Sequence, residues 1–202
     1  MLKQVALIAL MGMSASAAMA GHWQVKVGGS AIAPTKDTKI LNGAATVEAD
    51  NELAFTPSVE YFFNDNFSAE LLLATPISHD VTVSGAANAG VKIKHLPPTL
   101  TAKYNFKNST GFTPYVGVGV TAFIPWDEKA SGDLAGTRVK VKEDYGYAAQ
   151  VGVNFQPADA KNWGVFLDVR YADLNPKVET VAANFKLDID PVIYTLGYSY
   201  KF

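Results

Sequence analysis

The sequence predicts an all-β protein, an eight-stranded antiparallel transmembrane β-barrel of the outer membrane. Three observations lead to this prediction: an export signal at the N-terminus, repeated segments with a two-residue period, and an aromatic C-terminal segment. Every second residue of that last segment is apolar or aromatic: Val192, Tyr194, Leu196, Tyr198, Tyr200 and Phe202. Successive side chains of a strand point to opposite faces, so one face here suits lipid and the lipid–water boundary.

Residues 1–20 have the order of regions of a secretory signal peptide. Lys3 gives the first residues a positive charge, residues 5–13 are apolar, and Ala18-Met19-Ala20 forms a cleavage site of small residues. The apolar run is too short to cross a bilayer. We therefore expect a cleaved signal peptide at residues 1–20 and the barrel domain at 21–202. A buried N-terminal helix is the alternative that this order of regions disfavours.

The composition agrees with an exported barrel and excludes other classes. Hydrophobic residues make up 49% of the chain, yet no run of about 18 apolar residues follows the signal segment. The absence of Cys removes disulfide scaffolds, thiolate metal sites and cysteine nucleophiles. With 17 basic and 19 acidic residues, the chain has a net charge of −2, and nothing in this balance attracts nucleic acid.

Period-two alternation recurs in eight segments of the mature chain: 23–28, 53–61, 69–74, 96–106, 116–121, 145–155, 165–171 and 192–202. Short connections at 64–66, 107–113 and 156–162 alternate with long ones at 35–50, 84–93, 127–143 and 176–183. Outer-membrane barrels have short periplasmic turns and long extracellular loops, and an even strand number places both termini in the periplasm. We expect a helical turn in the third long loop.

A soluble barrel such as a lipocalin is the alternative to a membrane barrel. It would carry polar residues outside and apolar residues inside. In this chain the charged residues of the strands share one face, and the aromatic residues at the strand ends share the other. The membrane barrel is therefore favoured.

The charged residues that face inward by alternation are expected to plug the periplasmic half of the barrel. They are Lys26, Glu60, Glu70, Lys103, Asp168 and Lys201. The interior of an eight-stranded barrel is filled by side chains, and charges inside it must pair. We expect an ion-pair network that closes the direct path to the periplasm.

The inward positions nearer the long loops are mostly apolar and are expected to line a funnel: Ile32, Ala54, Thr56, Leu72, Ala74, Thr99, Thr121, Phe123, Ala148, Ala172 and Ile193. Such a funnel suits small apolar solutes that enter from outside. Because the plug lies below, these solutes would have to leave sideways into the outer-membrane lipid.

Three prolines mark a candidate lateral opening. Pro76 lies in one strand, and Pro97 and Pro98 interrupt the next. Proline donates no ladder hydrogen bond, so prolines that face each other across one seam weaken it. The alternative is a tolerated bulge or loop boundary, and the pattern alone leaves both open.

Six motifs together resemble the OmpW family of outer-membrane proteins: ELLLATP at 70–76 with His79, HLPPTL at 95–100, PYVGVG at 114–119, QVGV at 150–153, DIDP at 188–191 and GYSYKF at 197–202. The family includes the alkane-uptake protein AlkL. The resemblance implies a hydrophobic channel with lateral release near the prolines. It places Leu72 at the constriction below the funnel and Pro76, Pro97 and Pro98 at the lateral opening.

The resemblance also exposes one departure. A family member has a Trp at the gating position of the seventh strand, where this chain places Arg170, two residues from Asp168. Arg170 is therefore a channel-lining candidate. A charged constriction implies either a tighter plug or a different ligand preference.

The sequence favours passive uptake of small hydrophobic molecules without a cofactor. His79 and His95 could approach each other at the extracellular rim, but two imidazoles make an incomplete metal site. His79, Asp80 and Ser84 are too close in sequence for a convincing catalytic set, so an enzyme rests on fold analogy alone. A structural or surface-contact barrel with a plugged lumen is the other alternative. The strand ending at Phe202 is expected to engage the barrel-assembly machinery.

Overall fold

The computed structural model describes residues 21–85, 89–133, 135–180 and 184–202, with the backbone alone at 78–80. The expected signal peptide, residues 1–20, lies outside them. Eight strands close into an antiparallel barrel in the order β1 (His22–Ala33), β4 (Glu52–Phe62), β5 (Phe67–Leu72), β8 (Thr99–Asn105), β9 (Phe112–Gly132), β11 (Asp144–Phe155), β12 (Trp163–Ala172) and β15 (Val192–Lys201). The pairing of β15 with β1 closes the ring, which confirms the predicted fold.

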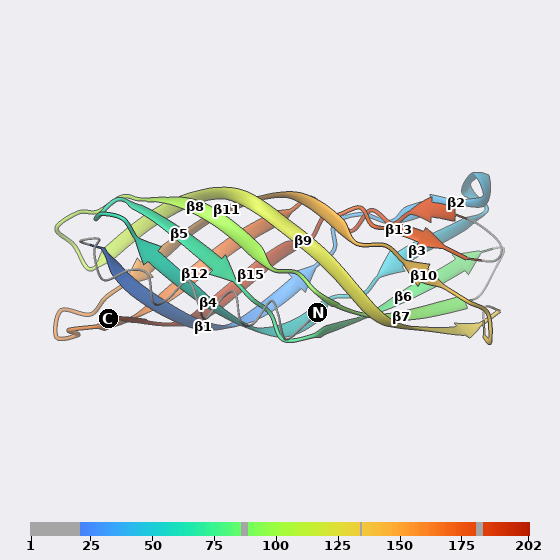
Figure 1. The fold of residues 1–202 in the computed structure, drawn as a ribbon, viewed down its shortest axis with the longest axis horizontal. Coiled ribbons are helices and arrows are strands. Elements are labelled where there is room, and N and C mark those ends of the chain that lie inside the picture. Colours follow the sequence, from blue (N-terminus) through green and yellow to red (C-terminus); the bar gives the residue numbers. More distant parts are fainter. Residues whose placement is uncertain (1–20, 86–88, 134, 181–183) are drawn as a thin grey trace.

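The segments predicted as long loops fold largely into further strands. Figure 1 shows them extending the barrel away from the end that holds the C-terminus. One sheet combines the upper part of β9 with β7 (Ala89–Leu96), β6 (Ile77–Gly85), β3 (Ala45–Ala49) and β2 (Thr38–Ile40). A smaller one contains β10 (Lys140–Val141), β13 (Lys177–Glu179) and β14 (Asn184–Lys186).

The helical turn lies elsewhere than predicted. Within the described part of the chain, the third connection contains the end of β9 and β10. A single 3-10 turn, η1 (Leu41–Gly43), belongs to the first connection instead. Leu41 and Asn42 adopt positive φ there, a conformation that sequence periodicity does not reveal.

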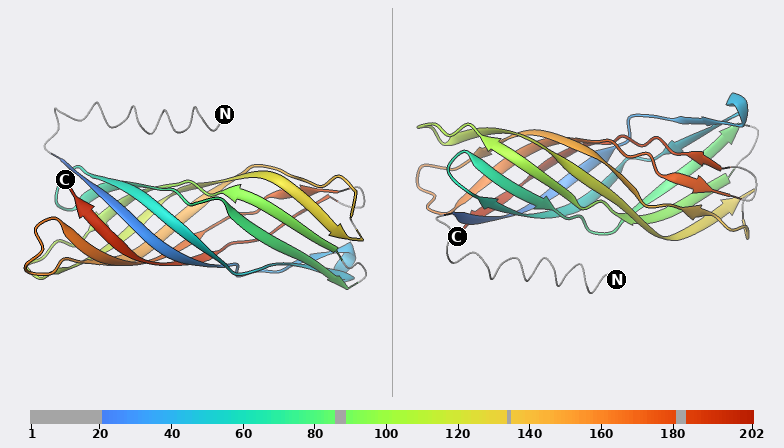
Figure 2. Two further views of the ribbon diagram at one scale, coloured as in Figure 1. Left: turned by 90° about the horizontal axis from the view of Figure 1, so that it is seen from below. Right: turned by 45° about the horizontal axis from the view of Figure 1, so that its top comes forward.

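The long strand β9 ties the two halves of the molecule together. Its lower part pairs with β8 and β11, and its upper part pairs with β7. Gly119 permits the close approach of β8, because a Cβ atom there would lie 2.0 Å from the carbonyl oxygen of Leu100. The two rotated views in Figure 2 show the tilted barrel strands continuing into the hairpins of the extension.

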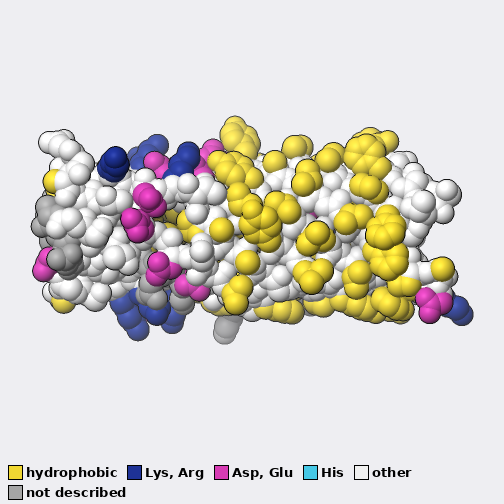
Figure 3. Space-filling model, turned by 180° about the vertical axis from the view of Figure 1, so that it is seen from behind, with side chains coloured by type: hydrophobic (Ala, Val, Ile, Leu, Met, Phe, Trp, Pro, Cys, Tyr) yellow, Lys and Arg dark blue, Asp and Glu magenta, His cyan; other side chains and the backbone are white. Residues whose placement is uncertain are grey.

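The outer surface divides into an apolar belt and a charged region. In Figure 3 the hydrophobic side chains gather over the barrel half, and the charged side chains gather over the extension. Exposed belt residues include Phe55, Leu100, Val118, Tyr147 and Leu196. No helix among the described residues is long and apolar enough to cross a membrane.

The extension has an apolar core of its own. Fourteen buried residues form one cluster: Ala45, Val47, Val81, Val83, Ala89, Val91, Ile93, Phe123, Val141, Ala172, Leu174, Val178, Leu187 and Ile189. A second cluster of Ile32, Ala74, Ile77 and Ile193 lies in the upper barrel. The half of the molecule farther from the C-terminus is therefore filled by apolar side chains.

Candidate functional site

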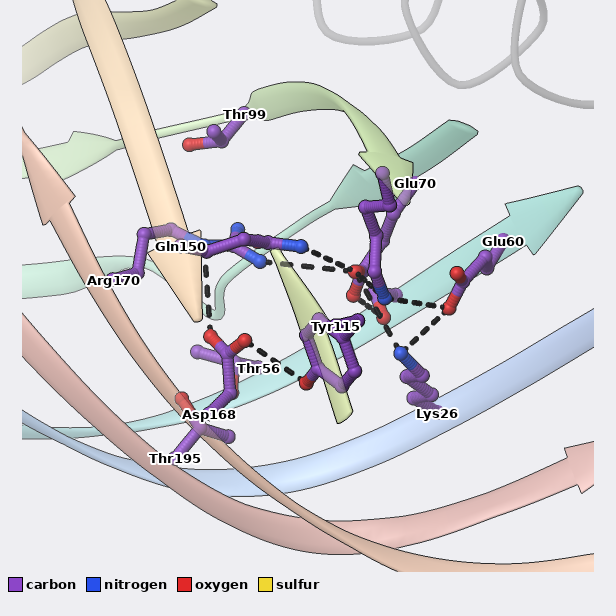
Figure 4. Close-up of polar contacts among 12 residues, drawn as sticks. Lys26, Thr56, Glu60, Glu70, Thr99, Tyr115, Gln150, Asp168, Arg170 and Thr195 are labelled. Atoms are coloured by element: carbon purple, nitrogen blue, oxygen red, sulfur yellow. Dashed lines mark hydrogen bonds and ion pairs between the residues drawn. The ribbon is translucent and has the colours of Figure 1, made fainter. Parts of the chain in front are cut away.

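A layer of buried ion pairs crosses the barrel interior (Figure 4). Lys26 Nζ lies 2.6 Å from Glu60 Oε2 and 3.7 Å from Glu70 Oε2. Lys103 Nζ bridges the same two oxygens at 2.9 and 2.8 Å. All four side chains are at most 4% exposed. Four strands, β1, β4, β5 and β8, bring these residues together because each places them on its inward face.

Further side chains join this layer from the opposite wall. Gln150 Nε2 donates to Glu70 Oε2 at 3.2 Å, and the Tyr115 hydroxyl donates to Asp168 Oδ2 at 3.0 Å. Lys103 Nζ lies 3.9 Å from the centre of the Tyr115 ring. Tyr115 is a member of the layer that charge alternation did not reveal.

Arg170 belongs to the charged layer. Its Nη2 lies 3.9 Å from Glu70 Oε2, and its Nε lies 3.7 Å from Asp168 Oδ1. Both ion pairs are longer than a hydrogen bond. The guanidinium reaches from β12 toward Glu70, beside Gln150 and Asp168 (Figure 4).

Lys201 lies apart from the layer. It is partly exposed, and its Nζ lies 3.5 Å from Gln156 Oε1. It lines a polar cavity of about 40 Å³ at the end of the barrel that holds the short turns, together with His22, Asp65 and Lys107 among others. The structure therefore gathers five of the six predicted plug residues and leaves Lys201 at the mouth.

Hydroxyl groups form a second layer next to the ion pairs. Ser30 Oγ lies 2.7 Å from both Thr56 Oγ1 and Thr195 Oγ1. Thr99 Oγ1 lies 2.9 Å from Thr121 Oγ1 across the neighbouring strand pair. We call these five residues the hydroxyl layer. It separates the charged groups from the apolar groups above it.

A small apolar cavity of about 30 Å³ lies above the hydroxyl layer, and we call it the inner cavity. Predicted residues that line it are Ile32, Thr56, Leu72, Ala74, Thr99, Thr121, Phe123, Ala172 and Ile193. Ala54 packs against the upper-barrel cluster that contains Ile32 and Ile193, without lining the cavity. Ala148 is buried between Gly119 and Ala172 and is also not part of the lining.

The two histidines lie on neighbouring strands, as expected, with His79 on β6 and His95 on β7, and His95 is buried. His95 is 4% exposed and stacks on Phe123 with ring centres 4.3 Å apart. The backbone of His79 pairs with Ile93, and His95 pairs with Ile77. Among the side chains that the structure describes, no group of three or more potential ligands gathers around a metal position.

A larger apolar cavity of about 200 Å³ lies in the extension, and we call it the outer cavity. Its lining includes Val47, Val81, Ile93 and Leu187, which belong to the same apolar cluster as Phe123 beside the inner cavity. The sequence does not predict this cavity, because its spacing predicts a loop at residues 84–93. The alternation of Val81 with Val83 and of Val91 with Ile93 is the signal that could have revealed it.

The strand ladder is interrupted at the prolines. Leu72 pairs with Thr99, and Ile77 pairs with His95. Between these pairs, residues 73–76 on one side face residues 96–98 on the other. The extra residue makes a bulge. We call these two segments the proline seam.

Backbone groups of the proline seam bond outward to other strands. The N–H groups of Leu73 and Thr75 donate to Pro57 and Phe55 of β4 at 2.8 and 2.9 Å. The carbonyl oxygen of Pro98 accepts from Ala122 of β9 at 3.0 Å. Within the described residues, no backbone hydrogen bond joins the two sides of the seam.

A polar clasp joins two connections at the rim. Lys36 Nζ lies 2.6 Å from Asp190 Oδ2, and the Leu174 N–H donates to Asp190 Oδ1 at 3.1 Å. Burial alone would raise the pKa of Asp190, but Lys36 and the Leu174 N–H hold that pKa below its usual value. The hydrogen bond that Lys36 donates to Asp190 raises the pKa of Lys36.

Known proteins with similar sequences and structures share this architecture. A sequence model of the OmpW family matches residues 19–202. Outer membrane protein W of Vibrio cholerae serotype O1 is 31% identical over 196 residues, covering 90% of this chain and 89% of the relative. Outer membrane protein AlkL of Ectopseudomonas oleovorans is 27% identical over 177 residues, covering 82% and 74%.

The crystal structure of the outer membrane protein OprG from Pseudomonas aeruginosa is similar to this structure. Its TM-score is 0.81 at 26% identity, and the match covers 91% of this chain and 97% of that one. The family match, these relatives and the closed barrel agree with one another. The chain therefore belongs to the OmpW family and is a β-barrel protein of the outer membrane.

Proposed function

We propose that the protein passively admits small hydrophobic molecules from outside the cell. The observation that carries this proposal is the order of layers inside the molecule. The outer cavity and the inner cavity are bordered by one apolar cluster, and the hydroxyl layer and the ion pairs lie beneath. Transfer of an apolar solute from water into the apolar upper part is favourable, whereas entry into the lower part would disturb paired charges.

Lateral release at the proline seam completes the proposed route. Pro97 lines the inner cavity, so the cavity borders the place where the ladder is interrupted. A gap there opens without breaking backbone hydrogen bonds across the seam. The solute would pass between the two sides of the proline seam, above the paired strands β5 and β8, into lipid and down its gradient. This role is not catalytic and uses no cofactor.

Assembly of the barrel is a further part of the proposal. Tyr198, Tyr200 and Phe202 project from the outer face of β15, and Phe202 is 72% exposed. Such a C-terminal aromatic row is available for recognition by the barrel-assembly machinery before insertion. The same residues then contact outer-membrane lipid.

Uptake of matched solutes tests the proposed function. Cells with the protein should take up small apolar solutes faster than cells with an inert eight-stranded barrel at equal expression, and small polar solutes at the same rate. Leu72→Arg should abolish this gain, because a charge would enter the apolar lining beside the hydroxyl layer. Ala74→Phe should reduce it without adding a charge, because the ring would fill the inner cavity.

Leu72→Met is the control, since it conserves volume and should retain uptake. Folding of each variant is checked by its heat-dependent shift in gel mobility. Unchanged uptake by folded Leu72→Arg and Ala74→Phe proteins would contradict the funnel. No protein-dependent uptake of any solute would favour the structural or surface-contact barrel instead, with the extension as its contact surface.

A further inference from the structure

Arg170 has hydrogen-bonding capacity that the barrel interior does not use. The residue is 2% exposed, and among the described residues its Nε and Nη1 atoms have no hydrogen-bond partner. Its two ion pairs are 3.7 and 3.9 Å long. Buried N–H donors nearly always find an acceptor, because an unmet donor is costly. These atoms therefore mark a place where an acceptor from a ligand would be stabilised.

Arg170 is adjacent on β12 and β15 to residues that line the inner cavity, although its own side chain is not part of the lining. Ile193, the cross-strand partner of Arg170, lines the inner cavity, and so does Ala172, two residues further along β12. Thr56, Thr99 and Thr121 line the same cavity and belong to the hydroxyl layer. The upper path is therefore apolar along its walls and polar at its floor, which matches a molecule with an apolar chain and one polar end.

The charge balance of the layer selects the kind of polar end. Lys26, Lys103 and Arg170 face three carboxylates, those of Glu60, Glu70 and Asp168. An incoming carboxylate would leave one buried negative charge without a counterion. A neutral oxygen acceptor would meet the free N–H groups without changing this balance.

We propose that Arg170 and the hydroxyl layer form a subsite for the neutral oxygen-bearing head, such as a carbonyl, of a small amphipathic solute. The inference rests on the proposed uptake function and names its substrate class. The inner cavity, about 30 Å³, accommodates a head of one or two heavy atoms, and the outer cavity, about 200 Å³, accommodates apolar chain atoms. Arg170 then determines specificity between apolar solutes with and without such a head.

Three solutes of equal chain length test this specificity: octane, 2-octanone and octanoate. The full protein is compared with Asp168→Asn/Arg170→Leu, which removes one charge of each sign and keeps the layer balanced. Asp168→Asn alone is the matched control, since an Asn oxygen still accepts from Tyr115. Uptake of each solute is measured in cells, with the gel-mobility shift as the folding check.

The double variant should lose about tenfold in 2-octanone uptake, the order expected when a hydrogen bond to a charged donor is lost. Its uptake of octane should not fall. Asp168→Asn should keep 2-octanone uptake, because the Arg170 donors remain, and should raise octanoate uptake, because it leaves one positive charge in the layer without a counterion. Equal loss of octane and 2-octanone, or no loss of either, would overturn the subsite. A selective loss of octanoate uptake would contradict the proposal that the bound head group is neutral.

A binding measurement separates this inference from the uptake proposal. In lipid nanodiscs, 2-octanone should shift the Arg170 Nε–H resonance, which is assigned by its absence from the double variant, and octane should not. A shift without any cellular uptake would leave the subsite standing and overturn the uptake function. Uptake without a shift would leave the uptake function standing and overturn the subsite.

Discussion

Glu70 is the residue on which most of the polar layer converges. Its carboxylate accepts from Ser58 at 2.7 Å, from Lys103 at 2.8 Å and from Gln150 at 3.2 Å. A buried carboxylate is tolerated only when its lone pairs and charge are satisfied in this way. The convergence explains how six ionic side chains share an interior too narrow for bulk water.

Asp190 provides a pH-dependent contact at the extracellular rim. Its folded-state pKa lies below its usual value of 3.8, so its contribution to stability is present above that value and is lost as the pH falls through the folded-state pKa. The raised pKa of Lys36 acts oppositely, and its contribution is lost only as the pH rises past 10.5. The clasp should therefore be intact between about pH 5 and pH 9.

Asp190→Asn should loosen the clasp at neutral pH while leaving the barrel folded. Asn tolerates the φ of +39° found at this position and can still accept from Leu174, so the change removes mainly the charge. We expect amide hydrogen exchange at Leu174 to become several-fold faster, because a neutral amide oxygen accepts its N–H less strongly than a carboxylate does. The protection of this amide should also no longer weaken at acid pH, because Asn does not titrate.

Asp188→Asn is the control for this change, since the neighbouring residue contributes its backbone N–H, not its carboxylate, to Thr38 Oγ1. Equal exchange rates in Asp190→Asn and the unmodified protein would contradict the clasp.

Single residues differed in how far the sequence could place them. Alternation on β1, β4, β5 and β8 was enough to bring Lys26, Glu60, Glu70 and Lys103 inside, because strand geometry decides the face. It could not separate Lys201 from them, since height along a barrel depends on register and tilt. It missed Tyr115 because the predicted strand began at residue 116, although the same alternation, continued by one residue, places this ring on the inward face opposite the valines.

At the scale of elements, the proline seam is the feature with a mechanical consequence. Replacing Pro97 and Pro98 with Ala restores two N–H donors beside residues 73–76. New bonds across the seam should slow the release of an apolar solute into lipid several-fold, without reducing resistance to unfolding. Release is measured by the transfer of a fluorescent apolar probe from the protein to vesicle lipid.

Pro114→Ala is the matched control, because Pro114 lies in the barrel wall between β8 and β11 and away from the seam. An equal release rate in the seam variant and this control would show that solutes leave elsewhere.

The elements themselves were predictable where a strand buries one face and exposes the other. That condition holds for the eight barrel strands, in which inward-facing and outward-facing residues alternate. It fails in the extension, where β2, β10, β13 and β14 are two or three residues long. Such strands are held by packing against the apolar cluster, and no short window of sequence contains that information.

The whole molecule is much taller than its apolar belt. β9 alone has 21 residues, which correspond to about 70 Å of strand, or about 50 Å of height at the usual tilt of barrel strands. The apolar band of such barrels is only about 25 Å tall. Roughly half of the molecule therefore stands outside the bilayer, as Figure 3 indicates.

The orientation of the molecule can be tested because the chain contains no Cys. A single cysteine at Lys129→Cys, in the extension, should react with a membrane-impermeant maleimide polymer on intact cells, since Lys129 is 70% exposed. A cysteine at Lys107→Cys, in the short turn after β8, should react only after the outer membrane is permeabilised. The opposite labelling pattern would invert the predicted topology.

The ion-pair layer has a consequence for the cell as a whole. A wide aqueous pore makes the envelope leakier with every copy that is inserted, to salts, sugars and polar antibiotics alike. Here buried charged side chains pair across the interior, and we expect them to block the passage of hydrated ions. We therefore expect that the cell can raise the abundance of this protein greatly while its surface stays as impermeable to water-soluble compounds as before.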